Sequence, residues 1–237
     1  MSPLGIGMTD FIEGTHLHLK EQLIDDMANA LAQQGFFQLS NFLPTLLAEQ
    51  LTQEIKSLAS IEFKSAGIGR NNSQQLNSQV RTDSTLWLSG NSATQRAYLN
   101  WMEQLRIGLN RRLFLGLFDF ECHYSHYSRG DFYRRHLDAF KGDTSRAQSN
   151  RMLSTVFYLN PNWVQGDGGE LLLYADQQVS PLLIVPPLFN SCVIFLSDAF
   201  PHEVLTSWCD RYSIAGWYRA NGASIEPLER FKQPIIL

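Results

Sequence analysis

The sequence predicts an α+β protein in which a helical layer packs on a β-sandwich or barrel. Three observations lead to this prediction. The first third of the 237-residue chain repeats apolar residues at helical spacing, and after Leu115 the pattern changes to short alternating runs separated by turn residues. Helices followed by strands favour an α+β arrangement over alternating α/β units. With 44% hydrophobic and 18% charged residues, the chain can bury a sizeable core.

Three helices are expected in the first half of the chain. The first ends before Gly35, because glycine favours the left-handed conformation that terminates helices; the second follows Pro44, and the third covers residues 93–115. Residues 35–43 alternate like a short strand, and residues 64–79 form a long polar loop of a kind that is often functional. The apolar helix faces comprise Leu19, Leu23, Ile24, Met27 and Leu31; Leu47, Leu51, Ile55 and Leu58; and Tyr98, Trp101, Met102 and Leu105.

Six strands are expected in the second half, over residues 119–127, 152–160, 170–175, 192–196, 204–205 and 212–218. No linker divides the chain, so we expect a single domain over residues 1–237. Its expected parts are a mainly helical support at 1–115 with a mobile loop near 64–79, a catalytic β-core at 116–220 and a C-terminal tail at 221–237.

Charge and cysteine content disfavour several classes of protein. The 19 basic and 23 acidic residues leave a net charge of -4, which argues against nucleic acid as a partner. Cys122, Cys192 and Cys209 fit neither a disulfide framework nor a zinc motif. The first residues lack a secretory pattern, and prolines interrupt the apolar stretch at 182–196. We therefore expect a cytoplasmic protein with no membrane partner.

A possible metal site begins with His136 and Asp138. On a strand, residues two apart point to the same side, so both side chains could reach one ion. His202, at the start of a predicted strand, is the candidate third ligand. Two histidines and one carboxylate that leave open positions form the facial triad of non-haem Fe(II) oxygenases. Taken singly, a His-x-Asp pair also occurs by chance at protein surfaces.

Arg211 is the candidate anchor for an organic acid. It lies nine residues after His202 and shares strand parity with Ser213, Ala215 and Trp217. A buried guanidinium needs an anionic partner, since leaving it unpaired costs about 3–5 kcal/mol. A dicarboxylate could supply that partner through bidentate hydrogen bonds. An ion pair with a neighbouring acidic residue is the alternative.

Two tyrosines, Tyr127 and Tyr158, could donate hydroxyl hydrogen bonds to the same carboxylate. Strand parity places Tyr127 opposite Cys122 and Tyr124, and either face of that strand could be the inner one. His123 and His126 are three residues apart, so a strand directs them to opposite faces. We interpret them as neutral core or rim histidines rather than metal ligands.

Together these residues resemble the 2-oxoglutarate- and Fe(II)-dependent oxygenases, and within them the oxygen-sensing prolyl hydroxylases of animals and their bacterial relatives. The resemblance covers roughly residues 79–218 and implies a double-stranded β-helix (jelly-roll) core supported by N-terminal helices. The segment around residue 130 is one residue shorter than in the animal enzymes. The matching pieces, in order, are Tyr127, Gly130, Tyr133, His136, Asp138, FYLN at 157–160, GGELLLY at 168–174, PHEV at 201–204 and RYSIAGWY at 211–218.

The resemblance also implies the ligands of the site. Fe(II) would be bound by His136, Asp138 and His202, which are the expected catalytic residues. The cosubstrate 2-oxoglutarate would be held by Arg211, Tyr158, Tyr127 and Ser213, with O2 as second cosubstrate and ascorbate as candidate reductant. The expected substrate contacts are Arg81, Asp83, Trp87, Arg151 and Trp217.

The implied function is a dioxygenase that hydroxylates a C–H bond and releases succinate and CO2. The favoured target is a prolyl residue in a protein, with elongation factor Tu as first candidate. One alternative is the same chemistry on a free amino acid or other small molecule. A second is a non-catalytic jelly-roll binding module.

Overall fold

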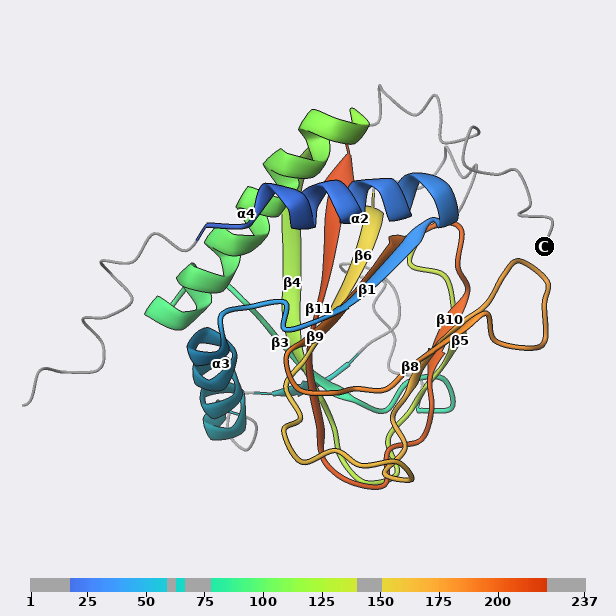
Figure 1. Ribbon diagram of the computed structural model, residues 1–237. Helices are drawn as coiled ribbons and strands as arrows, with labels where there is room; N and C mark the ends of the chain where they lie inside the picture. The colour runs from blue at the N-terminus through green and yellow to red at the C-terminus, as the bar shows by residue number, and fades with distance from the viewer. Residues whose placement is uncertain (1–17, 59–62, 67–77, 140–150, 221–237) are drawn as a thin grey trace, which may run out of the picture.

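Two facing antiparallel β-sheets make up most of the structure, a computed structural model that describes residues 18–58, 63–66, 78–139 and 151–220 (Figure 1). The helices are α2 (Glu21–Gln34), α3 (Thr45–Leu58) and α4 (Ala93–Leu113). The strands are β1 (Phe36–Ser40), β2 (Lys64–Ser65), β3 (Ser84–Trp87), β4 (Leu117–Tyr127), β5 (Tyr133–His136), β6 (Arg151–Tyr158), β7 (Leu171–Leu173), β8 (Leu183–Val185), β9 (Ser191–Leu196), β10 (His202–Val204) and β11 (Arg211–Ala220).

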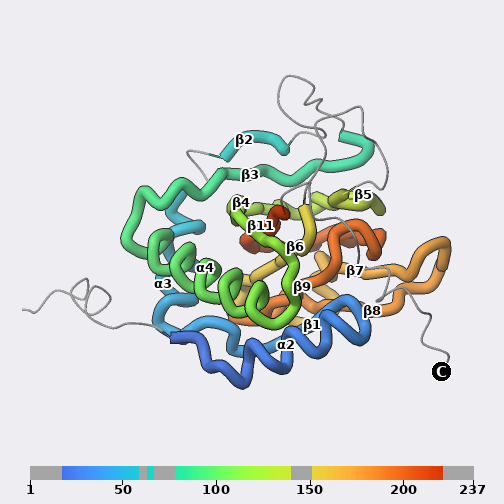
Figure 2. The backbone as a smooth tube through the Cα atoms, turned by 90° about the horizontal axis from the view of Figure 1, so that it is seen from above, coloured from blue at the N-terminus to red at the C-terminus, as the bar shows by residue number. Residues whose placement is uncertain are grey.

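The larger sheet has seven strands in the order β1-β9-β6-β11-β4-β3-β2, and the smaller has four in the order β5-β10-β7-β8. The three helices gather on the outer side of the larger sheet, and the smaller sheet lies away from them (Figures 1 and 2). This arrangement is the expected jelly-roll core with helical support.

The helices form where the sequence predicts them, for local reasons. Ile24, Met27 and Leu31 are buried along α2, and Gly35 ends that helix with φ 82° while its N–H bonds to the Leu31 carbonyl. Ser92 precedes α4, and its hydroxyl oxygen accepts a hydrogen bond from the Gln95 N–H. The apolar faces of the helices therefore become the outer half of the core.

A partly buried polar network joins the helical layer to the sheet. The Glu54 carboxylate, on α3, accepts hydrogen bonds from the Ser92 hydroxyl at 2.6 Å, the Gln95 amide at 2.7 Å and the Tyr124 hydroxyl at 3.1 Å. One side chain thus links α3, the start of α4 and β4. Because these donors are largely shielded from water, losing their common acceptor would leave several of them unsatisfied.

Alternation along β4 decides which residues face the interior between the sheets. Cys122 and Tyr124 point to the helical side, whereas His123, Ser125 and Tyr127 line the space between the sheets. The question that parity left open for Tyr127 is answered: it is on the inner face. β11 lies between β4 and β6, so its inner residues reach the middle of that space.

Four strands were not predicted: β2, β3, β5 and β8. Lys64–Ser65 pairs with β3, so the start of the predicted loop at 64–79 is a short edge strand. Residues 67–77 of that loop, and the predicted tail at 221–237, lie outside the described residues. Among the described helices, none has the length and apolar composition needed to cross a membrane.

Candidate active site

A cavity of about 510 Å³ opens between the two sheets. Its walls carry the inner side chains of β4 and β11 on one side and those of β5 and β10 on the other. Both groups of candidate residues, the metal donors and Arg211, line this one cavity. The prediction that Arg211, Ser213 and Trp217 share a face of their strand is confirmed.

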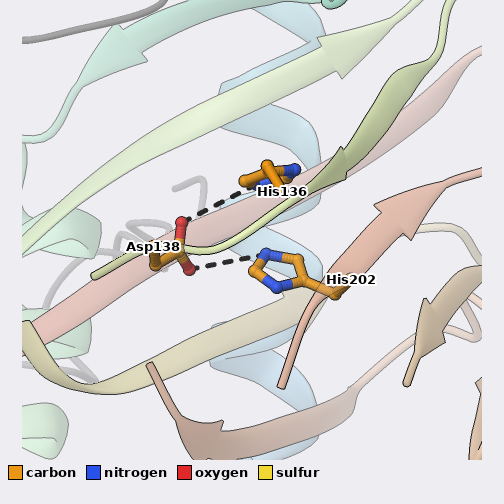
Figure 3. Close-up of side chains that lie close together, drawn as sticks. All are labelled: His136, Asp138 and His202. Carbon is orange, nitrogen blue, oxygen red and sulfur yellow. Dashed lines mark ion pairs between the residues drawn. The ribbon is translucent and has the colours of Figure 1, made fainter. Parts of the chain in front are cut away.

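Three metal-donor side chains meet in the cavity (Figure 3). The donor atoms of His136, Asp138 and His202 all lie within 4.8 Å of one another. The Asp138 carboxylate faces both rings, with Oδ1 3.7 Å from His136 Nε2 and Oδ2 3.5 Å from His202 Nε2. Within the described residues this is the one cluster of histidine, cysteine or acidic side chains whose geometry could hold a metal.

Strand pairing positions the two histidines. His136 is the last residue of β5 and lies directly opposite His202, the first residue of β10. The expectation that Asp138 continues the same strand is wrong, because the chain bends after His136. The Ser154 hydroxyl on β6 holds the displaced carboxylate with a 2.7 Å hydrogen bond.

Backbone carbonyls orient both imidazole rings. His136 Nδ1 lies 2.8 Å from the Arg134 carbonyl oxygen, and His202 Nδ1 lies 3.0 Å from that of Phe200. A carbonyl only accepts hydrogen bonds, so each Nδ1 carries the proton and each Nε2 keeps a free lone pair. Tyr133 stacks on His136 with ring centres 3.6 Å apart and further restricts that ring.

The electrostatics suit metal binding. Burial, together with the neighbouring His202, lowers the pKa of His136 to about 3. Burial acts to raise the pKa of Asp138, but His202 and His136 outweigh it and hold that pKa below its usual range. At neutral pH the site therefore offers a neutral imidazole and an ionised carboxylate. Two nitrogens and one carboxylate oxygen on one side of an ion fit Fe(II) and leave positions open for other ligands.

Arg211 is almost fully buried at 1% exposure. Its Nε donates to the Gly169 carbonyl at 2.8 Å, and its Nη1 donates to the Ser213 hydroxyl at 3.0 Å. In the described parts of the chain no carboxylate lies within ion-pair distance of Arg211, so the predicted alternative of a neighbouring acidic partner does not hold there. A buried cation without an anion fits the carboxylate of a bound organic acid.

Two tyrosines flank this guanidinium. Its carbon lies 4.7 Å from the ring centre of Tyr127 and 5.2 Å from that of Tyr158. Burial raises the pKa of both hydroxyls, which keeps them protonated as donors. The Tyr158 hydroxyl is buried beside the Arg211 guanidinium, which can only donate, so the hydroxyl proton has no acceptor among the described residues. An anion beside Arg211 would satisfy it.

Gly169 makes room for Arg211. Its φ is +75°, and a Cβ atom there would stand 2.7 Å from the Arg211 Cδ. Only glycine combines this left-handed backbone with such close packing at low cost. The GG pair at 168–169 is thus part of the structure that positions the arginine.

Four of the five predicted substrate contacts line the cavity: Arg81, Trp87, Arg151 and Trp217. Arg151 stacks over the Trp217 ring at 3.5 Å. Asp83 does not line the cavity: it is fully buried and accepts hydrogen bonds of 2.5 and 2.9 Å from Arg81. In this structure Asp83 therefore fixes the orientation of Arg81.

Several cavity-lining residues were not predicted from the sequence, among them Glu121, Ser154 and His123. His123 was interpreted as a core or rim histidine, and it is buried at 3% exposure but lines the cavity. His123 is four residues before Tyr127 on the same strand, so both side chains lie on one face, and once Tyr127 is assigned to the cavity this spacing could have identified His123 as a cavity residue. His126, on the other face of β4, stacks on Tyr212 with ring centres 4.6 Å apart and lies 2.8 Å from Asp210.

Comparisons with known proteins identify the class of enzyme to which this fold and this cavity belong. Residues 122–219 match the model of the 2OG-Fe(II) oxygenase superfamily. A Pseudomonas putida prolyl-4-hydroxylase crystal structure is 37% identical, with a TM-score of 0.74, and the match covers 84% of this chain and 100% of that one. A prolyl hydroxylase in complex with a hypoxia inducible factor oxygen degradation domain peptide fragment, from Trichoplax adhaerens, is 26% identical, with a TM-score of 0.69 and coverage of 84% and 90%.

Among curated proteins, prolyl hydroxylase EGLN3 of Homo sapiens is 24% identical over 231 residues, which is 91% of each chain. The chain therefore belongs to the 2OG-Fe(II) oxygenase superfamily and is a prolyl hydroxylase-like dioxygenase. Its cofactor is Fe(II), with 2-oxoglutarate and O2 as cosubstrates.

Proposed function

We propose that this dioxygenase hydroxylates a prolyl residue in a protein substrate and converts 2-oxoglutarate to succinate and CO2. The observation that carries the proposal is the single cavity in which a three-donor cluster faces a buried arginine without a described carboxylate partner. Both relatives with solved structures cited above are prolyl hydroxylases by name, and one was solved with a peptide fragment. These names support a prolyl target on a peptide chain.

In this proposal His136, Asp138 and His202 hold the iron. When bound with 2-oxoglutarate, the iron supplies the O2 activation that inserts oxygen into a C–H bond. The protein's own part is positional: the Arg134 and Phe200 carbonyls fix the two imidazoles in the tautomer that exposes Nε2.

Arg211 anchors the far carboxylate of 2-oxoglutarate in this proposal. Tyr158 donates its unpartnered hydroxyl to the same carboxylate, and Tyr127 lies close enough to assist. Ser213 accepts a hydrogen bond from Arg211 and keeps the guanidinium aimed along the cavity. The aromatic rings at this end of the cavity exclude water from the ion pair between Arg211 and the carboxylate. Excluding water strengthens their electrostatic attraction.

The substrate enters the other part of the cavity, which Trp87, Trp217 and Arg81 line. Trp87 is 53% exposed, so an incoming chain meets it first. Arg151, on β6 of the same sheet, extends this wall through its cation–π contact with Trp217. Asp83 acts indirectly, through its ion pair with Arg81.

The iron and cosubstrate assignment is tested by anaerobic titration with Fe(II) and 2-oxoglutarate. Chelation of the keto acid by ferrous iron produces a weak visible charge-transfer band. We expect the band with the unaltered protein and none with His202→Ala. His126→Ala, on the other face of β4, is the control and keeps the band. A full band with His202→Ala would contradict the assignment.

The substrate is tested separately. Elongation factor Tu, a cytoplasmic protein, is incubated with the iron-loaded enzyme, 2-oxoglutarate, O2 and ascorbate, and its tryptic peptides are examined for hydroxyproline by mass spectrometry. Hydroxylation that depends on 2-oxoglutarate supports the protein target. If free amino acids stimulate succinate formation and elongation factor Tu does not, the small-molecule alternative is favoured.

A further inference from the structure

His123 is a cavity residue that the proposed chemistry does not use. It lies on the inner face of β4, directly across from Trp87 on β3 and Ala215 on β11. Its ring centre is 5.2 Å from that of Trp87 and 5.4 Å from that of Trp217. The two tryptophan ring centres are themselves 6.4 Å apart, so the imidazole and the two indoles pack as one cluster of three rings beside the proposed path of the substrate.

The hydrogen bonds of His123 all fall on one ring nitrogen. Nδ1 lies 3.1 Å from the Tyr124 carbonyl oxygen and 3.1 Å from the Ser125 hydroxyl. A carbonyl accepts only, so the contact with Tyr124 requires a proton on Nδ1, and Ser125 can then accept a share of the same proton. Among the described residues none is hydrogen-bonded to Nε2.

The imidazole is also held neutral. Burial lowers the pKa of His123 to about 3, with the positive charge of Arg81 acting in the same direction. A neutral ring with its proton on Nδ1 presents a bare lone pair at Nε2. Because His123 lines the cavity, an N–H group of a bound ligand could donate to this lone pair.

We propose that His123 is a specificity-determining residue whose Nε2 accepts a hydrogen bond from an N–H group of the bound substrate. The inference rests on the proposed function, because it takes a prolyl peptide as the ligand. Proline has no backbone N–H, so the donor belongs to a residue adjacent to the target proline. The pairing would fix the register of the peptide along the wall that Trp87, His123 and Trp217 form.

A purely structural role for His123 predicts a different pattern. In that case the ring only fills space against the two indoles, and an apolar side chain of similar volume would serve equally well. His123→Leu keeps much of the volume and removes the acceptor. His123→Gln restores a polar atom near the position of Nε2. His126→Gln, on the opposite face of the same strand, is the matched control.

The first experiment is ¹⁵N NMR of histidine-labelled protein loaded with Zn(II) and 2-oxoglutarate, with His123 assigned by its loss in His123→Gln. We expect the resonances of a neutral ring with the proton on Nδ1 between pH 6 and pH 8. A ring with its proton on Nε2, or a charged ring in this range, would overturn the proposal.

The second experiment uses a library of peptides with a central proline and randomised neighbours. Three versions are compared: unmodified, N-methylated at the residue before proline, and N-methylated at the residue after it. With the unaltered enzyme, one methylated version should lose roughly tenfold in kcat/KM, the loss expected for one hydrogen bond. His123→Leu should show that loss already on unmodified peptides and no further loss on methylation. His123→Gln should recover part of it, and His126→Gln should match the unaltered enzyme.

The outcomes separate the two levels of inference. Equal kcat/KM for His123→Leu and the unaltered enzyme would overturn the role of His123 and leave the proposed function intact. Absence of hydroxylation of any peptide by the unaltered enzyme, with the ferrous charge-transfer band present, would overturn the prolyl target. A methylation penalty of the same size in both enzymes would place the acceptor elsewhere in the cavity.

Discussion

Tyr158 lies beside Arg211 at the enclosed end of the cavity, with its ring centre 5.2 Å from the guanidinium carbon. β6 and β11 bring them together, because Tyr158 is directly opposite Ser213 in the paired strands. A buried donor without a partner and a buried cation without a described acidic partner therefore face the same small space.

Removing Arg211 should weaken 2-oxoglutarate binding more than removing the Tyr158 hydroxyl does. Arg211 brings a positive charge and a multidentate donor to the carboxylate, whereas Tyr158 brings one neutral hydroxyl. We therefore expect Arg211→Ala to raise the KM for 2-oxoglutarate roughly 10- to 100-fold and Tyr158→Phe about three- to tenfold. Initial rates of succinate formation measure both. Arg111→Ala, an exposed arginine near the end of α4, is the control. An unchanged KM in Arg211→Ala would move the anchor to another residue.

Gly169→Ala should act on the site through Arg211. The new methyl group would stand 2.7 Å from Arg211 Cδ, so the arginine must shift and the KM for 2-oxoglutarate must rise. Gly130→Ala is a matched control, because Gly130 also has a positive φ, +98°, but a Cβ there meets nothing within 4 Å. Both variants should lose stability from backbone strain, and only Gly169→Ala should lose cosubstrate affinity. Equal KM values in the two variants would show that this contact does not position the arginine.

The stability of the protein should depend on pH through His123. Its pKa is lowered to about 3 in the folded state, below the value of about 6.5 expected when unfolded. Between these values the unfolded chain binds more protons, so stability falls as pH drops from about 6.5 towards 3. His123→Gln removes this contribution and should flatten the slope by up to about 1.4 kcal/mol per pH unit. Urea unfolding at several pH values between 7 and 4.5 measures it, with His126→Gln for comparison.

Glu54→Ala should destabilise the fold without removing any cavity side chain. It withdraws the acceptor of Ser92, Gln95 and Tyr124, and we expect a loss of about 2–4 kcal/mol in the free energy of unfolding. Glu49→Ala, exposed on the same helix, should change it by less than about 0.5 kcal/mol. Chemical denaturation compares the two, and equal losses would mean that the network contributes nothing specific.

Much of the fold was predictable because local patterns determine it. The helices α2, α3 and α4 carry uninterrupted apolar faces, and Gly35 and Pro44 mark boundaries by their backbone preferences. By contrast, β5 has a charged sequence, YRRH, whose exposed arginines hide the alternation. It is a strand because β10 pairs with it, and that partner is nearly 70 residues away in the sequence.

The cavity residues also divide into those that the sequence predicts and those that depend on distant parts of the chain. The spacing made His136, Asp138 and His202 candidates, the family resemblance led to the prediction that they meet, and the structure places their donor atoms within 4.8 Å. Spacing could not predict that Asp138 leaves the strand, because the cause is a hydrogen bond from Ser154 on another strand. Nor could it identify His123 as a cavity residue, since parity gives two faces without stating which one is inner.

The tryptophans that line the cavity make the site observable without a label. Trp87 and Trp217, with ring centres 6.4 Å apart, are two of the five tryptophans of the chain, and both border the cavity. Ferrous iron quenches nearby indole emission, and an incoming peptide displaces water from the exposed Trp87 ring. Intrinsic fluorescence can therefore follow metal loading and substrate entry as separate optical events in the unmodified enzyme, which makes stopped-flow study of their order practical before the natural substrate is known.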